Sequence, residues 1–299
     1  MKLMNVSYRA DKVLSLAGDG PDRLDHAELE KQCVSLVNAK MHGICFSPYE
    51  GDQQPGTPFT EAQVRRKLEL LKPHTTWVRI FSCTDGNDLI PQLAHEYGFK
   101  TMVGAWLGEE KDKNEEEMTR LVELAQAGFV DVAAVGNEVL YREEMDEAEL
   151  IACIDRVRTA LPNVPVGYVD AYYEFSDRPA LAEACDVILA NCYPYWEGCH
   201  MDYSLLYMKQ MYYQVKQAQP DKKIIITETG WPSEGEALGA AEPSYENALK
   251  YFINVQTWAR KEDIDMFYFA AFDEAWKVGT EGSVGAFWGL WDKDEKRKF

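Results

Sequence analysis

Residues 223–233 read KIIITETGWPS, and this stretch decides the fold. Its apolar run IIIT is typical of a β-strand that is buried on both faces, as in a parallel sheet covered by helices on both sides. The run FYFAAF at 267–272 has the same character. Both runs therefore predict an α/β protein rather than an antiparallel sandwich.

Working outward from this strand, short apolar or β-branched runs alternate with segments of helical period. The predicted strands are 42–47, 76–82, 100–106, 131–137, 164–169, 186–193, 223–227 and 265–272. The predicted helices are 61–72, 87–97, 114–127, 146–161, 178–184, 203–219 and 245–261. Eight strands alternating with helices, at a repeat of roughly 30 to 40 residues, predict a (β/α)8 TIM barrel.

A doubly wound open sheet is the alternative fold. The count of eight strands disfavours it, as does the absence of a G-x-G-x-x-G run after the first strand. The 299 residues contain no Pro/Gly/Ser-rich linker and no shift of composition, so we expect one domain. Within it, residues 1–40 form a polar N-terminal leader and residues 41–299 form the barrel. The segment 27–39 is predicted to be an extra helix that packs on the amino-terminal face of the barrel.

The composition narrows the function. The chain carries 31 Lys and Arg against 50 Asp and Glu, a formal net charge of −19, which would repel phosphate backbones and anionic lipid. We therefore expect neither nucleic-acid binding nor membrane binding. Aromatic residues make up 12% of the chain, including 8 Trp and 16 Tyr. Such a chain suits a polar, uncharged ligand that lies against aromatic faces.

Cysteine and histidine usage predicts neither a disulfide framework nor a metal site. The seven cysteines are odd in number and scattered, which favours free thiols in a reducing compartment. There is no C-x-x-C, the five histidines lie far apart, and no cofactor is expected. The first twenty residues hold no apolar run of signal-peptide length. We expect a cytoplasmic monomer, or a secreted one if an export signal has been trimmed.

Chemistry in this fold is carried by the carboxyl ends of the strands. The fourth strand is followed by Asn137 and Glu138, and the seventh by Glu228 and the turn that carries Trp231. Two carboxyl groups facing one cleft are what glycoside hydrolysis requires, one to protonate the leaving oxygen and one to attack. We predict that Glu138 and Glu228 are catalytic, that Asn137 supports them through a sugar hydroxyl, and that Trp231 is an aromatic platform.

The remaining strand ends are rich in side chains that bind sugars. Arg79 could orient a carboxylate or bind a hydroxyl, with a structural ion pair as the alternative. Aromatic rings stack on the apolar faces of pyranoses, although any single one is more often a core residue. The predicted substrate-binding residues at these ends are Arg79, Trp106, Tyr168, Asp170, Tyr193, Tyr195, Trp196 and Trp231. Glu274 and Lys277 follow the eighth strand as predicted catalytic support, or as a solvated ion pair.

Four motifs together resemble the signatures of glycoside hydrolase family 17. They are VGNEV at 135–139, NCYPYW at 191–196, TETGWPS at 227–233 and FDEAWK at 272–277. HGICFSP at 42–48 and VRIFSC at 78–83 resemble the first two strands of the bacterial members. The resemblance covers roughly residues 41–292, and TETGWPS is its most diagnostic part. It implies a β-1,3-glucanase or β-1,3-glucanosyltransferase with retaining chemistry.

The resemblance also assigns roles. Glu138 would be the general acid/base and Glu228 the nucleophile, while Glu274, Lys277 and Glu281 would match the charged trio around the nucleophile. Many members end the first strand with a tyrosine that supports the nucleophile. This chain has Phe46 there, and Tyr49 in the following loop is the expected substitute; we count Phe46, Tyr49 and Glu281 among the substrate-binding residues. The last loop, 278–287, is shorter than usual.

The predicted function is retaining hydrolysis of β-1,3-glucan or laminari-oligosaccharides through a covalent glucosyl-enzyme. The two carboxyl groups should then stand about 5–5.5 Å apart. The alternative within enzymes is a β-1,3-glucan transglycosylase that uses the same two glutamates. A sugar-binding barrel without catalysis is disfavoured by the pair of close like charges, and a Schiff-base enzyme using Lys277 by the absence of an apolar pocket around it.

Overall fold

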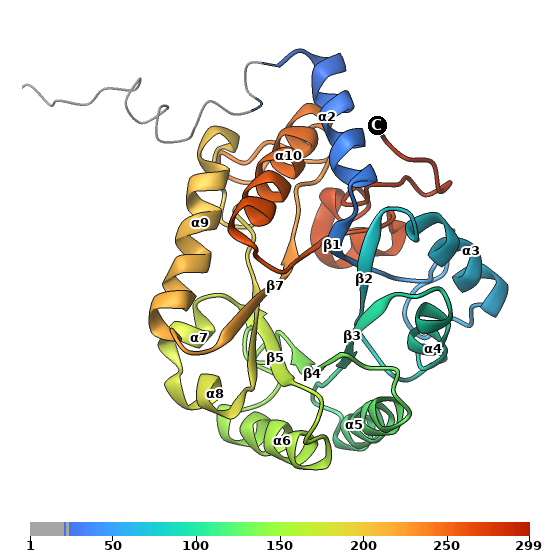
Figure 1. Ribbon diagram of the computed structural model, residues 1–299, viewed down its shortest axis with the longest axis vertical. Helices are drawn as coiled ribbons and strands as arrows, with labels where there is room; N and C mark the ends of the chain where they lie inside the picture. Colours follow the sequence, from blue (N-terminus) through green and yellow to red (C-terminus); the bar gives the residue numbers. More distant parts are fainter. Residues whose placement is uncertain (1–20, 22–23) are drawn as a thin grey trace, which may run out of the picture.

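Eight parallel strands form a closed barrel in the order β1 to β8 in the computed structural model of the protein, which describes residue 21 and residues 24–299 (Figure 1). Residues 1–20, 22 and 23 of the predicted leader lie outside the described residues. The strands are β1 Met41–Cys45, β2 Thr75–Ile80, β3 Lys100–Ala105, β4 Val132–Asn137, β5 Val166–Ala171, β6 Val187–Asn191, β7 Lys223–Thr229 and β8 Met266–Tyr268. The predicted (β/α)8 fold is confirmed.

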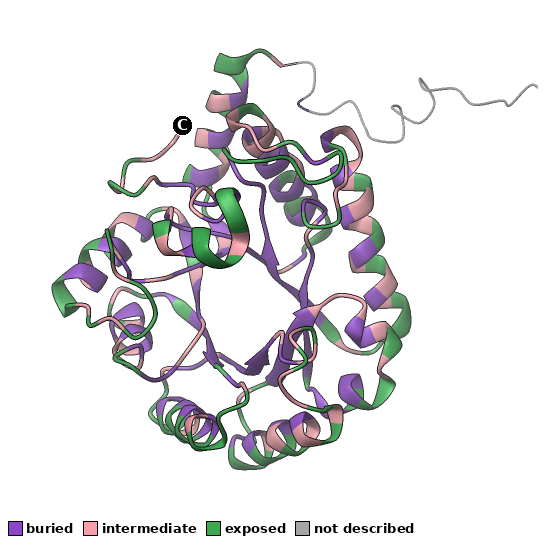
Figure 2. Ribbon diagram, turned by 180° about the vertical axis from the view of Figure 1, so that it is seen from behind, coloured by how far each residue is buried: buried purple, intermediate pink, exposed green. Residues whose placement is uncertain are grey.

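The helices lie outside the barrel and follow their strands in sequence. They are α3 Glu61–Leu71, α4 Leu89–Glu96, α5 Lys111–Gln126, α6 Glu147–Ala160, α7 Glu174–Asp177, α8 Pro179–Ala184, α9 Met201–Ala218 and α10 Tyr245–Glu262. β8 is followed only by short turns: the 3₁₀ helix η2 Ala275–Lys277, α11 Val278–Glu281 and the 3₁₀ helix η3 Gly282–Val284. The strands and the inner faces of the helices are buried, and the outer helix faces are exposed (Figure 2). The apolar core thus lies mainly between the sheet and the helix ring.

The helix before β1, α2 His26–Asn38, does not pack on the amino-terminal face as predicted. It runs alongside α10 in the outer ring (Figure 1). The hydroxyl of Tyr245, at the start of α10, donates to Glu30 at 2.9 Å, and Arg260 near its end donates to the Leu36 carbonyl at 2.7 Å. Because β8 has no long helix after it, α2 takes the eighth position of the ring.

The segment after β8 explains why that strand is shorter than predicted. From Ala270 to Asp273 the backbone bonds to the C-terminal segment: the Ala270 N–H donates to the Trp288 carbonyl at 3.0 Å, and the Asp273 N–H to the Trp291 carbonyl at 2.9 Å. The predicted strand 265–272 therefore divides between β8 and this second pairing. As a result, the C-terminal segment supports the loop that carries Glu274 and Lys277.

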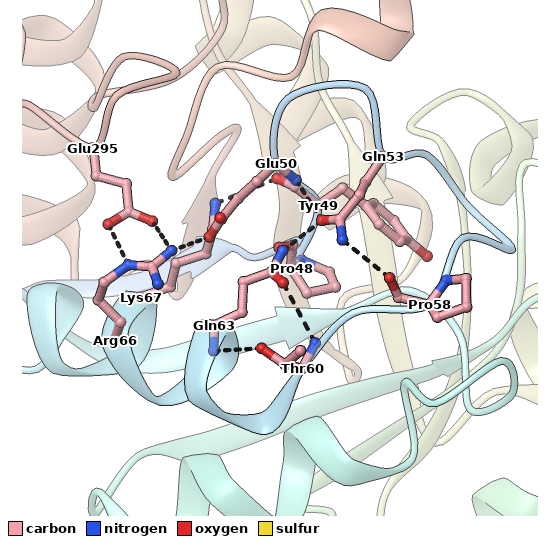
Figure 3. A network of polar contacts seen from close by, with 10 residues as sticks. All are labelled: Pro48, Tyr49, Glu50, Gln53, Pro58, Thr60, Gln63, Arg66, Lys67 and Glu295. Atoms are coloured by element: carbon pink, nitrogen blue, oxygen red, sulfur yellow. Dashed lines mark hydrogen bonds and ion pairs between the residues drawn. The ribbon is translucent and has the colours of Figure 1, made fainter.

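The loop after β1 is fastened to α3 and to the C-terminal segment by a polar network (Figure 3). Thr60 caps α3 reciprocally with Gln63, whose amide also donates to the Pro48 carbonyl at 3.0 Å. Arg66 pairs with Glu50 in the loop and, at 2.9 Å, with Glu295. This network fastens the loop to α3 and to the C-terminal segment.

The cysteines are free thiols, as predicted. Five of the seven are buried in the core, and burial raises the pKa of Cys33 and of Cys45 to about 12. Within the described part of the chain, no helix is long and apolar enough to cross a bilayer. In the same part, no group of three or more His, Cys, Asp or Glu side chains is arranged to hold a metal ion.

Candidate active site

The two predicted catalytic glutamates lie at strand ends where the pairing between strands is irregular. The pairing of β4 with β5 shifts register between Ala134 and Asn137, and that of β6 with β7 shifts between Ala190 and Asn191. Such bulges turn side chains that a regular strand would direct elsewhere. Glu138, directly after β4, has a φ of 53° in the left-handed region, which is uncommon for a residue other than glycine. Strained backbone of this kind concentrates at functional sites.

Asn191, at the end of β6, joins the two carboxyl groups. Its side-chain nitrogen lies 2.8 Å from Oε1 of Glu138 and 3.2 Å from Oε1 of Glu228. Because one atom contacts both oxygens at these distances, the two oxygens lie no more than 6.0 Å apart. The Thr227 hydroxyl donates to the other end of the Asn191 amide at 2.8 Å and thereby fixes which end faces the carboxyl groups. The structure thus brings Glu138 and Glu228 into one site.

Arg79 pairs with Glu228 from the end of β2. Its guanidinium donates to Glu228 Oε1 at 2.5 Å and to the side-chain oxygen of Asn137 at 2.6 Å, and only 2% of the residue is exposed. One nitrogen of the buried guanidinium thus contacts the carboxyl group and the other contacts the amide, and the contact with the carboxyl group is a charge-assisted hydrogen bond. Arg79 therefore holds Glu228 through a buried ion pair, and its contact with the substrate stays a prediction. Asn137 is held in the same network.

Tyr193 supports Glu228 directly: its hydroxyl donates to Oε2 of Glu228 at 2.9 Å. The expectation that Tyr49 would do so is wrong, because the Tyr49 ring packs edge-on against Phe59 and Trp276. The tyrosine that contacts the nucleophile candidate thus comes from the sixth strand end and not from the first.

The site holds its two carboxyl groups in different environments. Burial, followed by the negative charge of Glu228, raises the pKa of Glu138 to about 7. Glu228 instead accepts hydrogen bonds from Arg79, Asn191 and Tyr193. One carboxyl group able to hold a proton near neutral pH, beside one that accepts hydrogen bonds from three side chains, is the division of environments that acid-assisted displacement needs.

The charged trio after β8 is also assembled. Lys277 Nζ lies 2.6 Å from Glu274 Oε2 and 4.0 Å from the ring centroid of Phe269, and both members of the ion pair are almost completely buried. Glu281 lies at the end of the short helix α11, and its negative charge acts on Lys277 together with that of Glu274. Burial raises the pKa of Glu281 to about 7. The alternative of a solvated ion pair for Glu274 and Lys277 is wrong.

The residues predicted to contact the sugar differ in how much of their surface is exposed. Trp106 and Trp196 are 41% and 39% exposed and are available as platforms. Five others are at most 1% exposed, which leaves them no surface for direct contact with a sugar; they are Phe46, Tyr168, Asp170, Tyr195 and Trp231.

The polar atoms of these buried residues bond to the protein instead. The Tyr168 hydroxyl donates to Asp170 and accepts from the Leu140 N–H at 3.0 Å. Tyr195 and Trp231 donate to backbone carbonyls of the loop after β7, at 3.0 and 2.9 Å. Phe46 packs against Phe272, with 6.5 Å between ring centroids. These residues shape the loops around the site rather than the sugar-binding surface.

Three important residues were not predicted. Asn191 was visible in the motif NCYPYW, but its position at a strand end was the only signal. Glu117 on α5 is 1% exposed and accepts from Ser82, Cys83, Thr84 and Trp106, so it ties the loops after β2 and β3 to one helix. Arg142, in the loop after β4, contacts the strand end that carries Glu138. Helical periodicity predicts α5 but not these contacts.

The barrel and its paired glutamates define the class of the protein, which is a glycosidase built on a (β/α)8 fold. Residues 43–289 match the family described as the BtgE/BtgC glycoside hydrolase domain. The chain belongs to this family, within glycoside hydrolase family 17.

Curated relatives and solved structures agree with this assignment. The chain is 28% identical over 258 residues to a glucan 1,3-beta-glucosidase of Candida albicans, covering 78% of this chain and 83% of that protein. It is 28% identical over 273 residues to one of Saccharomyces cerevisiae, covering 82% and 86%. The crystal structure of a family 17 β-1,3-glucanosyltransferase from Rhizomucor miehei has a TM-score of 0.78 at 29% identity, covering 87% of this chain and 96% of that one. An active-site mutant of the Rhizomucor miehei β-1,3-glucanosyltransferase, in complex with laminaritriose, has a TM-score of 0.79.

Proposed function

We propose that this protein is a retaining enzyme that cleaves β-1,3-linked glucan or its oligosaccharides, with Glu228 as nucleophile and Glu138 as general acid/base. The contact of the Asn191 amide with both carboxyl groups carries the proposal, because it limits their nearest oxygens to 6.0 Å. Inverting enzymes need about 6.5–9.5 Å between the carboxyl groups to accommodate a water molecule, whereas retaining enzymes use about 5–5.5 Å.

The reaction divides between the two groups. Glu138 donates its proton to the glycosidic oxygen while ionised Glu228 attacks the anomeric carbon and forms a glucosyl-enzyme ester. Ionised Glu138 then removes a proton from the incoming hydroxyl, which displaces Glu228 and regenerates both starting states. Asn191 lies between the two carboxyl groups and can donate to whichever of them is ionised at each step.

The β-1,3-glucan substrate is inferred from the relatives. The curated relatives are named glucan 1,3-beta-glucosidases, and the Rhizomucor miehei mutant was crystallised with laminaritriose. Trp106 and Trp196 provide exposed rings for stacking on glucosyl units. The monomeric state remains a prediction.

Transglycosylation is the second candidate, favoured by the similarity to the Rhizomucor miehei β-1,3-glucanosyltransferase. The glucosyl-enzyme is the same, and a sugar hydroxyl replaces water as the acceptor. The two outcomes differ in the products formed over time: hydrolysis yields only shorter chains, whereas transfer also yields chains longer than the substrate.

The test is incubation of the purified protein with laminaritetraose and, separately, with cellotetraose, followed by chromatography of the products. We expect cleavage of laminaritetraose, little action on cellotetraose, and a loss of at least about 1000-fold in Glu228→Gln, since a nucleophile is removed. The variant Glu183→Gln, which changes an exposed carboxyl group on α8, should retain wild-type activity. Equal turnover by Glu228→Gln and wild type would contradict the proposal.

A further inference from the structure

Arg142, four residues after Glu138, connects two loops at the mouth of the barrel. Its guanidinium donates to the Asn137 carbonyl and, at 3.2 Å, to the Leu107 carbonyl in the loop after β3. It also forms an ion pair with Glu144 at 2.7 Å. Carbonyl groups at the ends of two adjacent strands therefore share one cationic partner.

The same guanidinium lies against the Trp106 ring, with its central carbon 4.7 Å from the ring centroid. A planar cation at this distance interacts favourably with the π-face of tryptophan and occupies that face of the ring. Trp106 is nevertheless 41% exposed, so part of its ring is open to a ligand. Arg142 thus holds the ring that is available to a sugar.

The Asn137 carbonyl matters because it belongs to the peptide unit that links Asn137 to Glu138. The N–H of this unit donates to the Val169 carbonyl on β5 at 2.7 Å, and its carbonyl accepts from Arg142. The unit is therefore held from both sides, immediately before a residue with a φ of 53°. Rotation of this unit would move the Glu138 carboxyl group away from the glycosidic oxygen.

The other end of the contact is rigid. The Trp106 N–H donates to buried Glu117 at 3.1 Å, and the Asn114 side chain bonds to both the N–H and the carbonyl of Gly108, at 2.9 and 2.7 Å. Both acceptor residues lie on α5, so the loop after β3 is fixed to the helix ring. Arg142 therefore connects the peptide unit before Glu138 to a loop that is itself fixed to α5.

We propose that Arg142 is a positioning residue, which holds the acid/base carboxyl of Glu138 in a set geometry relative to the sugar platform Trp106. A glucosyl unit stacked on Trp106 is then presented with its glycosidic oxygen within reach of the Glu138 proton. This inference rests on the proposed function, because it assigns Glu138 the proton-donating role.

The test compares two substrates that differ in their need for a proton. Laminaritetraose has a sugar leaving group that must be protonated, whereas 2,4-dinitrophenyl β-laminaribioside has one that departs without a proton. Arg142→Lys retains the charge but cannot make the forked contacts. Arg156→Lys is the matched control, because Arg156 forms only an exposed pair with Glu115 beside its contact with Met118.

We expect kcat/KM of Arg142→Lys on laminaritetraose to fall at least about 10-fold further than on the dinitrophenyl glycoside, a part of the roughly 10²–10⁴ that a positioned general acid contributes. A decrease of kcat/KM that is the same for both substrates would reflect a change in the position of Trp106, which the guanidinium contacts. Arg156→Lys should match wild type on both. Equal losses of Arg142→Lys on the two substrates would overturn the inference.

Glu144→Gln provides a second variant, because it weakens the anchor of Arg142 while leaving the arginine in place. In Glu144→Gln, kcat/KM should again fall further on laminaritetraose than on the dinitrophenyl glycoside, but by a smaller factor. This variant keeps the inference testable if Arg142→Lys fails to fold. Equal losses on the two substrates in Glu144→Gln would also refute the inference. Failure of the wild type to cleave laminaritetraose would refute the proposed function instead. The two failures are therefore distinguishable.

Discussion

The pKa of Glu138 should fall when the charge of Glu228 is removed. The nearest oxygens of the two carboxyl groups lie no more than 6.0 Å apart, and two unit charges at that distance repel by about 3 kcal/mol at an effective dielectric constant near 20. A repulsion of that size would change the pKa of Glu138 by about two. Because the Arg79 guanidinium already offsets part of the Glu228 charge, we expect the pKa of Glu138 to fall by about one to two units in Glu228→Gln, from about 7 in the wild type.

The direction follows from the ionised form of Glu138. Removing a neighbouring negative charge makes that form less unfavourable, and the unpaired Arg79 adds a positive charge close by. The assay is a pH titration of ¹³C-labelled glutamate carboxyl signals by NMR, with Glu138→Gln to assign the resonance. Glu183→Gln, which alters an exposed carboxyl group, should leave the titration unchanged. An unchanged or raised pKa of Glu138 in Glu228→Gln would refute the reasoning.

Three further outcomes follow from the same contacts. Wild-type kcat/KM on laminaritetraose should decline as the pH rises through about 7, because Glu138 must be protonated to act as the acid; activity that is constant to pH 9 would contradict this. Tyr193→Phe should lower kcat about 10-fold or more with little change in the melting temperature, since it removes one hydrogen bond to a charged group, and kinetics beside thermal unfolding would check it. Glu117→Gln should lower the free energy of unfolding in urea by about 2–4 kcal/mol, because the amide offers one acceptor oxygen where the carboxylate serves four donors; a loss below about 0.5 kcal/mol would count against it.

The positions of the strands could be predicted because parallel strands buried on both faces require continuous apolar runs. The place of α2 could not, because the amphipathic pattern of a helix is the same whether it covers the end of a barrel or joins its ring. Contacts with Tyr245 and Arg260, 215 and 224 residues away from their partners, decide it. The short β8 likewise depends on pairing with the C-terminal segment, which periodicity does not reveal.

The two glutamates could be predicted because their places at strand ends suffice to put them at the mouth of the barrel. The orientation of neighbouring side chains could not be predicted, because register shifts at Asn137 and Asn191 determine which residues face the two glutamates. Tyr193 turns toward Glu228, whereas Tyr168 turns away and bonds to the loop after β4. An aromatic residue at a strand end thus predicts proximity to the site but not contact with the sugar.

The position of Arg142 shows how little of the surrounding support is visible in sequence. It follows Glu138 by four residues, yet two of its contacts lie on the loop after β3, at Leu107 and Trp106. A charged residue in a loop is ordinarily solvated, so only the assembled fold distinguishes it from its neighbours. Geometry around a catalytic group is set by such contacts as much as by the group itself.

The central claim is that Glu228 forms a covalent bond to the sugar. The most direct measurement is incubation with 2,4-dinitrophenyl 2-deoxy-2-fluoro-β-laminaribioside, followed by mass spectrometry of the intact protein and of its peptides. The fluorine slows both the formation and the hydrolysis of the glycosyl-enzyme, whereas the dinitrophenyl leaving group keeps its formation fast enough to occur. A retaining enzyme therefore accumulates the glycosyl ester. We predict one fluoro-disaccharide on the peptide that contains Glu228. An unmodified protein that cleaves laminaritetraose with inversion at the anomeric carbon would contradict the account.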